Sequence, residues 1–368
     1  MVMHPPNNFN AQTIHALQVH ALRVPMPTPH RTASGVVAES PLIATDITLG
    51  DGTVGHSLIF TYTVAALKPT AELINNLLPL LQDRPLAPAD VYQYLQQRLR
   101  LLGSQGLVGM AISAIDMALW DALARQHGLP LCRLLGAEPK PIRAYAPVGY
   151  DGELESARIA EAWARQGFTG VKAKIGYPKL AEDIAVVRAM RQAVGPDVQI
   201  MVDYNQSLNP SEATHRLRAL DEEGLAWVEE PTTAHDHAAH ARIAAASCTP
   251  IQAGENWWSP MEVRHAIESQ ATDLLMLDVM KIGGVTGWLG GSALAQTHGL
   301  PLSSHLFPEV SAQLLCASPT AHWLEYADWW SEVLTEPVVV EKGWVSAATM
   351  QGSGIAWAPD ALNEFAAC

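Results

Sequence analysis

The sequence of 368 residues is poor in charge, and this shortage excludes some classes of protein. Charged residues make up 16% of the chain, where about 25% is usual, and hydrophobic residues make up 48%. A chain that is this long and this apolar can bury a large core, which excludes intrinsic disorder. Lysine and arginine number 23, and aspartate and glutamate number 37. The resulting formal net charge of −14 disfavours a nucleic-acid partner.

Cysteines and long apolar runs are also few. The four cysteines are scattered without a CxxC pair, which is typical of a reducing compartment. No run of 18 apolar residues is present, so no membrane span is expected. The first twenty residues lack the basic and apolar stretches of a signal peptide. We therefore expect a soluble, cytoplasmic protein without a membrane partner.

The first part of the chain, residues 1–138, has the pattern of a mixed α+β domain. Apolar stretches at 14–24, 41–47 and 55–62 are separated by Gly, Pro and Asp turns, which predicts a meander of strands. A helix is expected over 111–128, because apolar residues recur there at helical spacing and Gly128 is placed to end it.

From about residue 139 to 341, short apolar runs alternate with helical patterns. Eight such runs indicate an α/β domain of the TIM-barrel type, with an open doubly wound sheet as the alternative. The tail, 342–368, is too short to fold alone and is expected to return to the first domain. The expected strands are 142–148, 170–175, 199–203, 226–230, 251–255, 274–278, 301–305 and 322–326.

Most of the expected strands end in polar residues at a regular spacing. The separations are 26 residues (203 to 229 and 229 to 255) and 27 residues (278 to 305), about one strand–helix unit each. The carboxyl ends of barrel strands meet at one mouth, where active sites of this fold lie. The residues expected there are Lys172, Lys174, Asp203, Glu229, Glu255, Asp278, His305 and Glu325.

Three of these acids are expected on adjacent barrel strands, the third to the fifth. Asp203, Glu229 and Glu255 would repel one another unless a cation lies between them, and an all-oxygen ligand set favours Mg²⁺. A histidine-rich segment elsewhere in the chain, with His235, His237 and His240, is interpreted as a solvated helix start rather than a metal site.

Two groups of candidate bases face these acids. Lys172 and Lys174 alternate on one strand, so both point to the same face, where each ammonium is expected to lower the pKa of the other. Asp278 can hold the tautomer of His305 and raise its basicity. Opposed bases beside Mg²⁺ suggest that an α-proton is removed from a carboxylate substrate, which gives an enediolate that the metal stabilises. Glu325 is expected to be kept protonated by burial, so that it can donate a hydrogen bond to this enediolate.

At these residues the chain resembles the mandelate racemase/muconate lactonizing enzyme family of the enolase superfamily. The resemblance is dense from 170 to 330, in VKAKIGYP, IMVDYNQSL, VEEPT, GENW, MKIGGVTGW, PLSSHLF and SPTAHWLE. It implies an enolase-like barrel under an α+β capping domain, a homo-oligomer, and Mg²⁺ held by Asp203, Glu229 and Glu255.

The resemblance also implies roles for the other residues. Lys174 would act on the (S) enantiomer of a 2-hydroxy acid, and the His305–Asp278 pair on the (R) enantiomer. Lys172 and Glu325 would bind the substrate carboxylate, and Asn205 and Lys281 would support the site.

Two departures from the family's racemase concern the substrate. Pro147 stands where the racemase has a serine donor, and the lid segment around Val37 carries His30, Arg31 and Ser34 among positions that are largely apolar there. His30 is therefore a candidate substrate-binding residue, together with Asn205 and Lys172. The substrate is expected to be mandelate or a related, more polar acid.

Three functions remain open. The leading hypothesis is a Mg²⁺-dependent racemase of a 2-hydroxy acid that uses two bases. A dehydratase of acid sugars would use the same bases, and the polar lid favours it. A catalytically silent binding protein would be expected to lack a base or a ligand, and the sequence retains them all.

Overall fold

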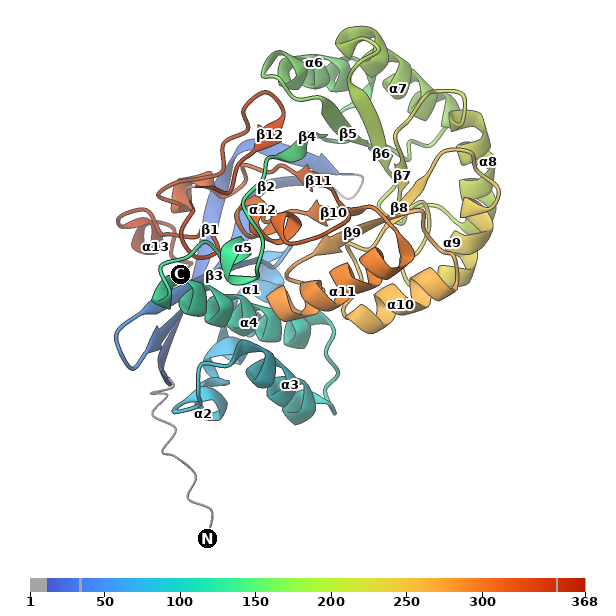
Figure 1. Ribbon diagram of the computed structural model, residues 1–368. Coiled ribbons are helices and arrows are strands. Elements are labelled where there is room, and N and C mark those ends of the chain that lie inside the picture. Colours follow the sequence, from blue (N-terminus) through green and yellow to red (C-terminus); the bar gives the residue numbers. More distant parts are fainter. Residues whose placement is uncertain (1–11, 33–34, 349, 368) are drawn as a thin grey trace.

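The computed structural model describes residues 12–32, 35–348 and 350–367, and it contains a closed barrel with a smaller α+β domain beside it (Figure 1). The smaller domain has a three-stranded antiparallel sheet in the order β1(Ile14–Thr32), β2(Gly35–Leu49), β3(Val54–Phe60). Its helices are α1(Val64–Asn75), α2(Leu78–Leu81), α3(Pro88–Leu99), α4(Gly106–Gln126) and α5(Leu131–Leu134).

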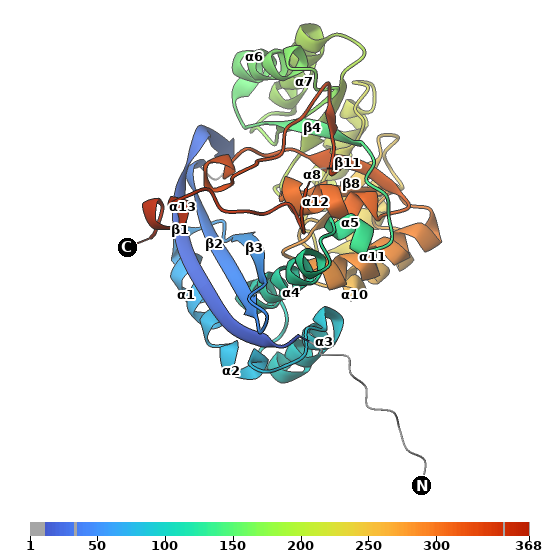
Figure 2. The ribbon, with the colours of Figure 1, turned by 60° about the vertical axis from the view of Figure 1, so that its left-hand side comes forward.

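The first two strands are much longer than the sequence pattern predicts. The lid segment contributes paired strand residues at the far end of the β1–β2 hairpin, with His30 opposite Val37 and Arg31 opposite Val36. Pro25, which lacks a donor, marks a register shift before this end of the hairpin. The resulting ribbon is long and curved and reaches the barrel (Figure 2).

Helix α4 is the central core helix of the smaller domain. It ends where expected, with Gly128 in the left-handed conformation at φ +66°. By length and composition it would pass as a membrane span, but 78% of its most apolar window is buried inside the protein. It packs against β3 and β2 as well as α1, which accounts for its apolar surface.

The barrel has eight parallel strands, as predicted, and closes between its last and first strands. Most residues of these strands are buried, which suits strands that are covered on both faces. The strands are β4(Ile142–Val148), β5(Gly170–Lys174), β6(Gln199–Asp203), β7(Val228–Glu229), β8(Ile251–Ala253), β9(Leu274–Asp278), β10(Leu302–His305) and β11(Ala321–Glu325). The helices between them are α6(Gly152–Arg165), α7(Leu180–Val194), α8(Pro210–Leu220), α9(His237–Ala244), α10(Pro260–Glu268), α11(Gly284–His298) and α12(Pro308–Cys316).

The last part of the chain contacts both domains. Strand β12(Trp344–Val345) pairs antiparallel with the start of β4, after the short 3-10 helix η1(Ser331–Val333). Beyond α13(Ala361–Glu364), the amide of Arg23 donates to the carbonyl of Phe365, and that of Ala367 donates to Ala21. The last described residues therefore lie against β1, and Figure 2 shows α13 beside this strand.

The two domains also contact each other directly, at a joint formed by α4 and the start of α11. The Asp116 carboxylate accepts hydrogen bonds from the backbone amide of Thr286 at 3.0 Å and from its hydroxyl at 2.5 Å. Trp120 donates its indole N–H to the same hydroxyl at 2.9 Å. A side chain of the smaller domain thus caps the helix that follows β9.

Candidate active site

Three carboxylates converge at the carboxyl ends of β6, β7 and β8. Asp203, Glu229 and Glu255 are buried, and one oxygen of each lies within 4.8 Å of the others. In the parallel ladder Asp203 is the register partner of Glu229, which explains why residues 26 positions apart come together. Such a buried all-oxygen set fits a hard divalent cation.

One carboxylate oxygen without a hydrogen bond supports the fit to a divalent cation. Oε2 of Glu255 is buried and has no hydrogen bond among the described residues, although the Nε2 of His305 lies 3.3 Å away. Burial raises the pKa of Glu255, but the charges of His305, Lys174 and other bases lower it more, so this carboxyl is ionised. A buried anionic oxygen with a free lone pair is suited to coordinate a metal ion.

The two lysines of β5 point into the same cluster. Lys172 lies 2.8 Å from Glu229 and 2.7 Å from Glu325, and Lys174 lies 2.6 Å from Asp203. The expected lowering of their pKa values is wrong for this arrangement. Burial lowers the pKa of each lysine, and the ammonium of Lys172 also lowers that of Lys174, but the surrounding carboxylates raise both pKa values by more. A cation among these carboxylates would offset their charge and bring the pKa of Lys174 down again.

His305 and Asp278 form the expected pair at the ends of β10 and β9. The Nδ1 of His305 lies 2.7 Å from Oδ2 of Asp278, and the two residues are partners in the ladder. Asp278 is held in turn by the backbone amides of Met280 and Lys281. Its Nε2 lies 3.3 Å from Glu255 and 3.7 Å from Glu325 and so faces the cluster. Burial lowers the pKa of His305, but Glu255, Glu325 and Asp278 raise it above its usual value.

Glu325 lies in the mouth, at the end of β11, but it is not the neutral acid that the sequence suggested. Burial raises its pKa, but Lys172 and His305 lower it more, to about 2. Its Oε2 also accepts the backbone amide of Leu306 at 3.0 Å. Burial alone therefore does not protonate this carboxyl, because a buried ammonium at 2.7 Å favours the charged form.

Supporting residues surround the cluster. Asn205, in the left-handed conformation at φ +43°, donates its backbone and side-chain N–H groups to Asp203, so it orients this acid. The ammonium of Lys281 donates to Asn256 at 2.6 Å, and Asn256 donates to Glu255 at 3.2 Å.

Three of the residues that support the site were not predicted from the sequence. Asn256 was visible only as part of GENW, and Gln252, which donates to Glu229, has no distinctive pattern. Tyr62 comes from the smaller domain, and its hydroxyl donates to Oδ2 of Asp278 at 3.3 Å. No local signal in the sequence connects Tyr62 with a residue 216 positions away.

The far end of the β1–β2 hairpin covers the mouth. His30 lines an enclosed cavity together with both lysines, His305 and Glu325, and Pro147 and Trp329 complete its outer wall. The cavity is about 20 Å³, roughly the space of one water, which is too small for a substrate of several heavy atoms. Arg31 lies 3.5 Å from Asp151 on the outer side. Ser34, also expected in this lid, lies outside the described residues.

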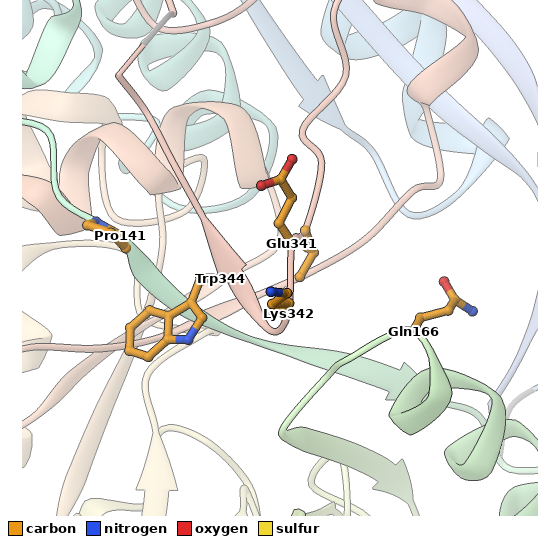
Figure 3. A pocket seen from close by; sticks show the side chains of 6 residues that line it. Pro141, Gln166, Glu341, Lys342 and Trp344 are labelled. Atoms are coloured by element: carbon orange, nitrogen blue, oxygen red, sulfur yellow. The ribbon is translucent and has the colours of Figure 1, made fainter.

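Two other features do not belong to the site. The histidine-rich segment starts α9, as expected, but His240 is buried and its Nε2 contacts the carbonyl of Thr232, so the interpretation as a solvated surface is wrong there. A hollow of about 860 Å³ lies at the amino-terminal end of β4, lined by Pro141, Gln166 and residues of the 340–344 turn (Figure 3). Its position at the opposite end of the barrel separates it from the carboxylates.

Comparison with known proteins gives family matches over most of the chain. Residues 155–361 match the family described as enolase C-terminal domain-like, and residues 16–136 match the mandelate racemase / muconate lactonizing enzyme N-terminal domain. An L-talarate/galactarate dehydratase from Salmonella typhimurium is 36% identical over 67% of this chain, a match that spans 63% of that relative. A 3,6-anhydro-alpha-L-galactonate cycloisomerase from Streptomyces coelicolor is 31% identical over 93% of this chain and 96% of its own.

A solved structure is similar along the whole length. An enolase from Bradyrhizobium, complexed with magnesium and mandelic acid, superposes with a TM-score of 0.93 and 41% identity over 98% of this chain and 100% of its own. The relatives thus include a dehydratase and a cycloisomerase as well as a protein that binds mandelic acid. From its barrel, its capping sheet and these matches, the chain belongs to the mandelate racemase/muconate lactonizing enzyme family of the enolase superfamily.

Proposed function

We propose that this protein is a Mg²⁺-dependent racemase of a 2-hydroxy acid that moves the α-proton between two bases. The observation that carries the proposal is the placement of two basic groups against one carboxylate cluster. Lys174, on the second barrel strand, contacts Asp203, and His305, on the seventh, contacts Glu255. A substrate carbon held between them would meet one base on each face.

Each residue has a role in this proposal. Asp203, Glu229 and Glu255 hold Mg²⁺, which supplies positive charge where negative charge develops on the substrate carboxylate. Lys174 removes the proton from the (S) enantiomer, and His305, oriented by Asp278, removes it from the (R) enantiomer. The other base returns a proton to the opposite face, and this inverts the carbon.

Two further residues bind the substrate carboxylate. Lys172, buried between Glu229 and Glu325, offers an ammonium group that can pair with it. A substrate carboxylate beside Glu325 adds negative charge there and raises the pKa of this acid, so that it can donate a hydrogen bond. Asn205 keeps Asp203 oriented beside the bound substrate.

Isotope exchange tests the two-base proposal. In D₂O with Mg²⁺, the wild-type enzyme is expected to exchange the α-hydrogen of both enantiomers of its substrate. His305→Asn should stop exchange from the (R) enantiomer and spare the (S), and Lys174→Ala should do the reverse. Losses of at least about 100-fold are expected for the affected enantiomer, since a positioned base contributes about that much or more. Equal loss of both activities in both variants would contradict the assignment.

A dehydratase of acid sugars is the second candidate, and two observations favour it. A dehydratase is among the relatives, and the lid carries a polar His30 in the cavity wall. Dehydration would remove the α-proton with the same bases and expel a hydroxide from the neighbouring carbon. A 2-keto acid assay on sugar acids separates the two reactions, because racemisation leaves no keto acid.

We also propose a homo-oligomer in the cytoplasm. The described cysteines Cys132, Cys248 and Cys316 are free, which is consistent with a reducing compartment. Light scattering after size-exclusion chromatography measures the oligomeric state.

A further inference from the structure

A buried carboxylate outside the active-site cluster joins three segments of the barrel. Asp183 lies in the first turn of α7 and is 0% exposed. Its Oδ1 accepts the backbone amides of Gly176 and Tyr177, each at 2.9 Å. Its Oδ2 accepts the hydroxyl of Tyr204 at 2.9 Å and pairs with the guanidinium of Arg216 at 2.8 Å. A buried carboxylate with these four bonds fixes the segments that it holds.

Two of these segments come directly after residues of the active site. Lys174 ends β5, and the two bound amides belong to the second and third residues after it. Asp203 ends β6, and the bound hydroxyl belongs to the next residue, Tyr204. Lys174 and Asp203 are partners in the strand ladder, and beside them the amide of Ile175 donates to the carbonyl of Asp203 at 2.9 Å. Asp183 therefore links the two strands again, just beyond this ladder.

The loop after Lys174 packs closely on these bonds. At Gly176, φ is +109° and a Cβ would lie 2.9 Å from the hydroxyl oxygen of Ser207 and 3.3 Å from the ring of Tyr204. Glycine is needed for so close an approach of the backbone. Arg216 also donates to the carbonyl of Tyr177 at 2.7 Å. The loop is thus held through its amides by the acid and through a carbonyl by the base that pairs with this acid.

The other proposed base lies outside this network. His305 ends β10, and its ion-pair partners among the described residues are Asp278, Glu255 and Glu325. None of these three acids shares a bonding partner with Asp183 in the described part of the chain. A change at Asp183 is therefore expected to displace Lys174 more than His305.

We propose that Asp183 is a positioning residue that holds Lys174, at the end of β5, against Asp203, at the end of β6. The inference rests on the proposed two-base reaction and adds to it a residue that sets the reach of one base. A base must lie within hydrogen-bond reach of the proton that it removes, so a small displacement of Lys174 slows proton removal from the (S) enantiomer. A metal ion held by Asp203 serves both enantiomers, so a displacement of this ligand affects both equally.

Hydrogen exchange from the two enantiomers tests this role. With saturating Mg²⁺ in D₂O, NMR measures kcat/KM for α-hydrogen exchange from the (S) and (R) enantiomers of mandelate and lactate. Asp183→Asn keeps the size of the side chain and loses its charge, so the ratio of (S) to (R) exchange should fall about 10- to 100-fold, the usual effect of losing a group that orients a site. Tyr204→Phe removes one hydrogen bond and should lower the ratio about two- to tenfold.

Val187→Ala is the matched control. Val187 lies one turn further along α7, is 0% exposed and belongs to the apolar core. Its truncation destabilises the protein but breaks no bond to the loops, so it should keep the wild-type ratio. A ratio unchanged by Asp183→Asn would overturn the positioning role. If circular dichroism shows that Asp183→Asn does not fold, Tyr204→Phe decides, and an unchanged ratio in this variant would overturn the role.

A wild-type protein that exchanged neither enantiomer of either acid would overturn the proposed function instead. Calorimetric titration with Mg²⁺ would then decide the role of Asp183, because Asp203 is one of the proposed ligands. Binding about tenfold weaker in Asp183→Asn than in Val187→Ala would support the role, and equal Kd values would overturn it. A wild-type protein that bound no Mg²⁺ would overturn both proposals.

Discussion

The carboxyl group of Asp116 is predicted to make the joint between the two domains sensitive to pH. It is 1% exposed, and burial raises its pKa from 3.8 to about 7, although hydrogen bonds from Thr286 oppose the shift. The folded protein therefore holds this proton more tightly than the unfolded chain does. The stabilisation is complete below about pH 4 and is lost as the pH rises through about 7.

The size of the effect follows from these two pKa values. Between pH 5 and pH 8 the linkage relation gives a loss of about 2–3 kcal/mol in the free energy of unfolding from this one group. Unfolding entropy of about 2 cal/mol/K per residue converts this loss to about 3 °C in Tm for a chain of this length. Asp116→Asn cannot ionise, so its Tm should fall by about 3 °C less than that of the wild type over this range.

Thermal unfolding followed by circular dichroism at pH 5, 6, 7 and 8 measures this difference. EDTA should be present, so that metal binding adds no pH dependence of its own. Asp197→Asn, a substitution of an exposed aspartate, is the control and should follow the wild-type curve. Parallel curves for Asp116→Asn and the wild type would refute the reasoning.

Three further changes have definite expected outcomes. Gly284→Ala would place a Cβ 2.4 Å from the carboxylate of Asp116 at a φ of +70°, so it should lower the free energy of unfolding by about 2–4 kcal/mol in urea titrations. Glu229→Gln removes one anionic ligand and should weaken Mg²⁺ binding at least about tenfold in calorimetry. Tyr62→Phe removes the 3.3 Å hydrogen bond to Asp278 and should slow α-exchange of the (R) enantiomer less than about tenfold, with exchange of the (S) enantiomer unchanged.

The barrel and its mouth were predictable because their signals are local and repeat. Each strand is a short run that can be recognised from its own residues. The carboxyl ends of all the barrel strands lie at one mouth, so the residues that end the strands come together there. The strand register then pairs Lys174 with Asp203 and Asp203 with Glu229. The hairpin over the mouth was not predictable in this way, because the prolines 25, 27 and 29 interrupt the alternation that marks a strand.

The protonation states in the site were the least predictable feature, because they depend on distances between groups from different strands. Two lysines at alternate positions of one strand suggest mutual lowering of their pKa values. In the structure, however, Lys172 lies 2.8 Å from Glu229 and 2.7 Å from Glu325, and sequence spacing does not reveal these contacts. The same contacts ionise Glu325, which burial alone would have kept neutral. Mg²⁺ and a substrate carboxylate add charges of opposite sign to this network, so the working pKa values of Lys174 and Glu325 belong to the loaded site as a whole.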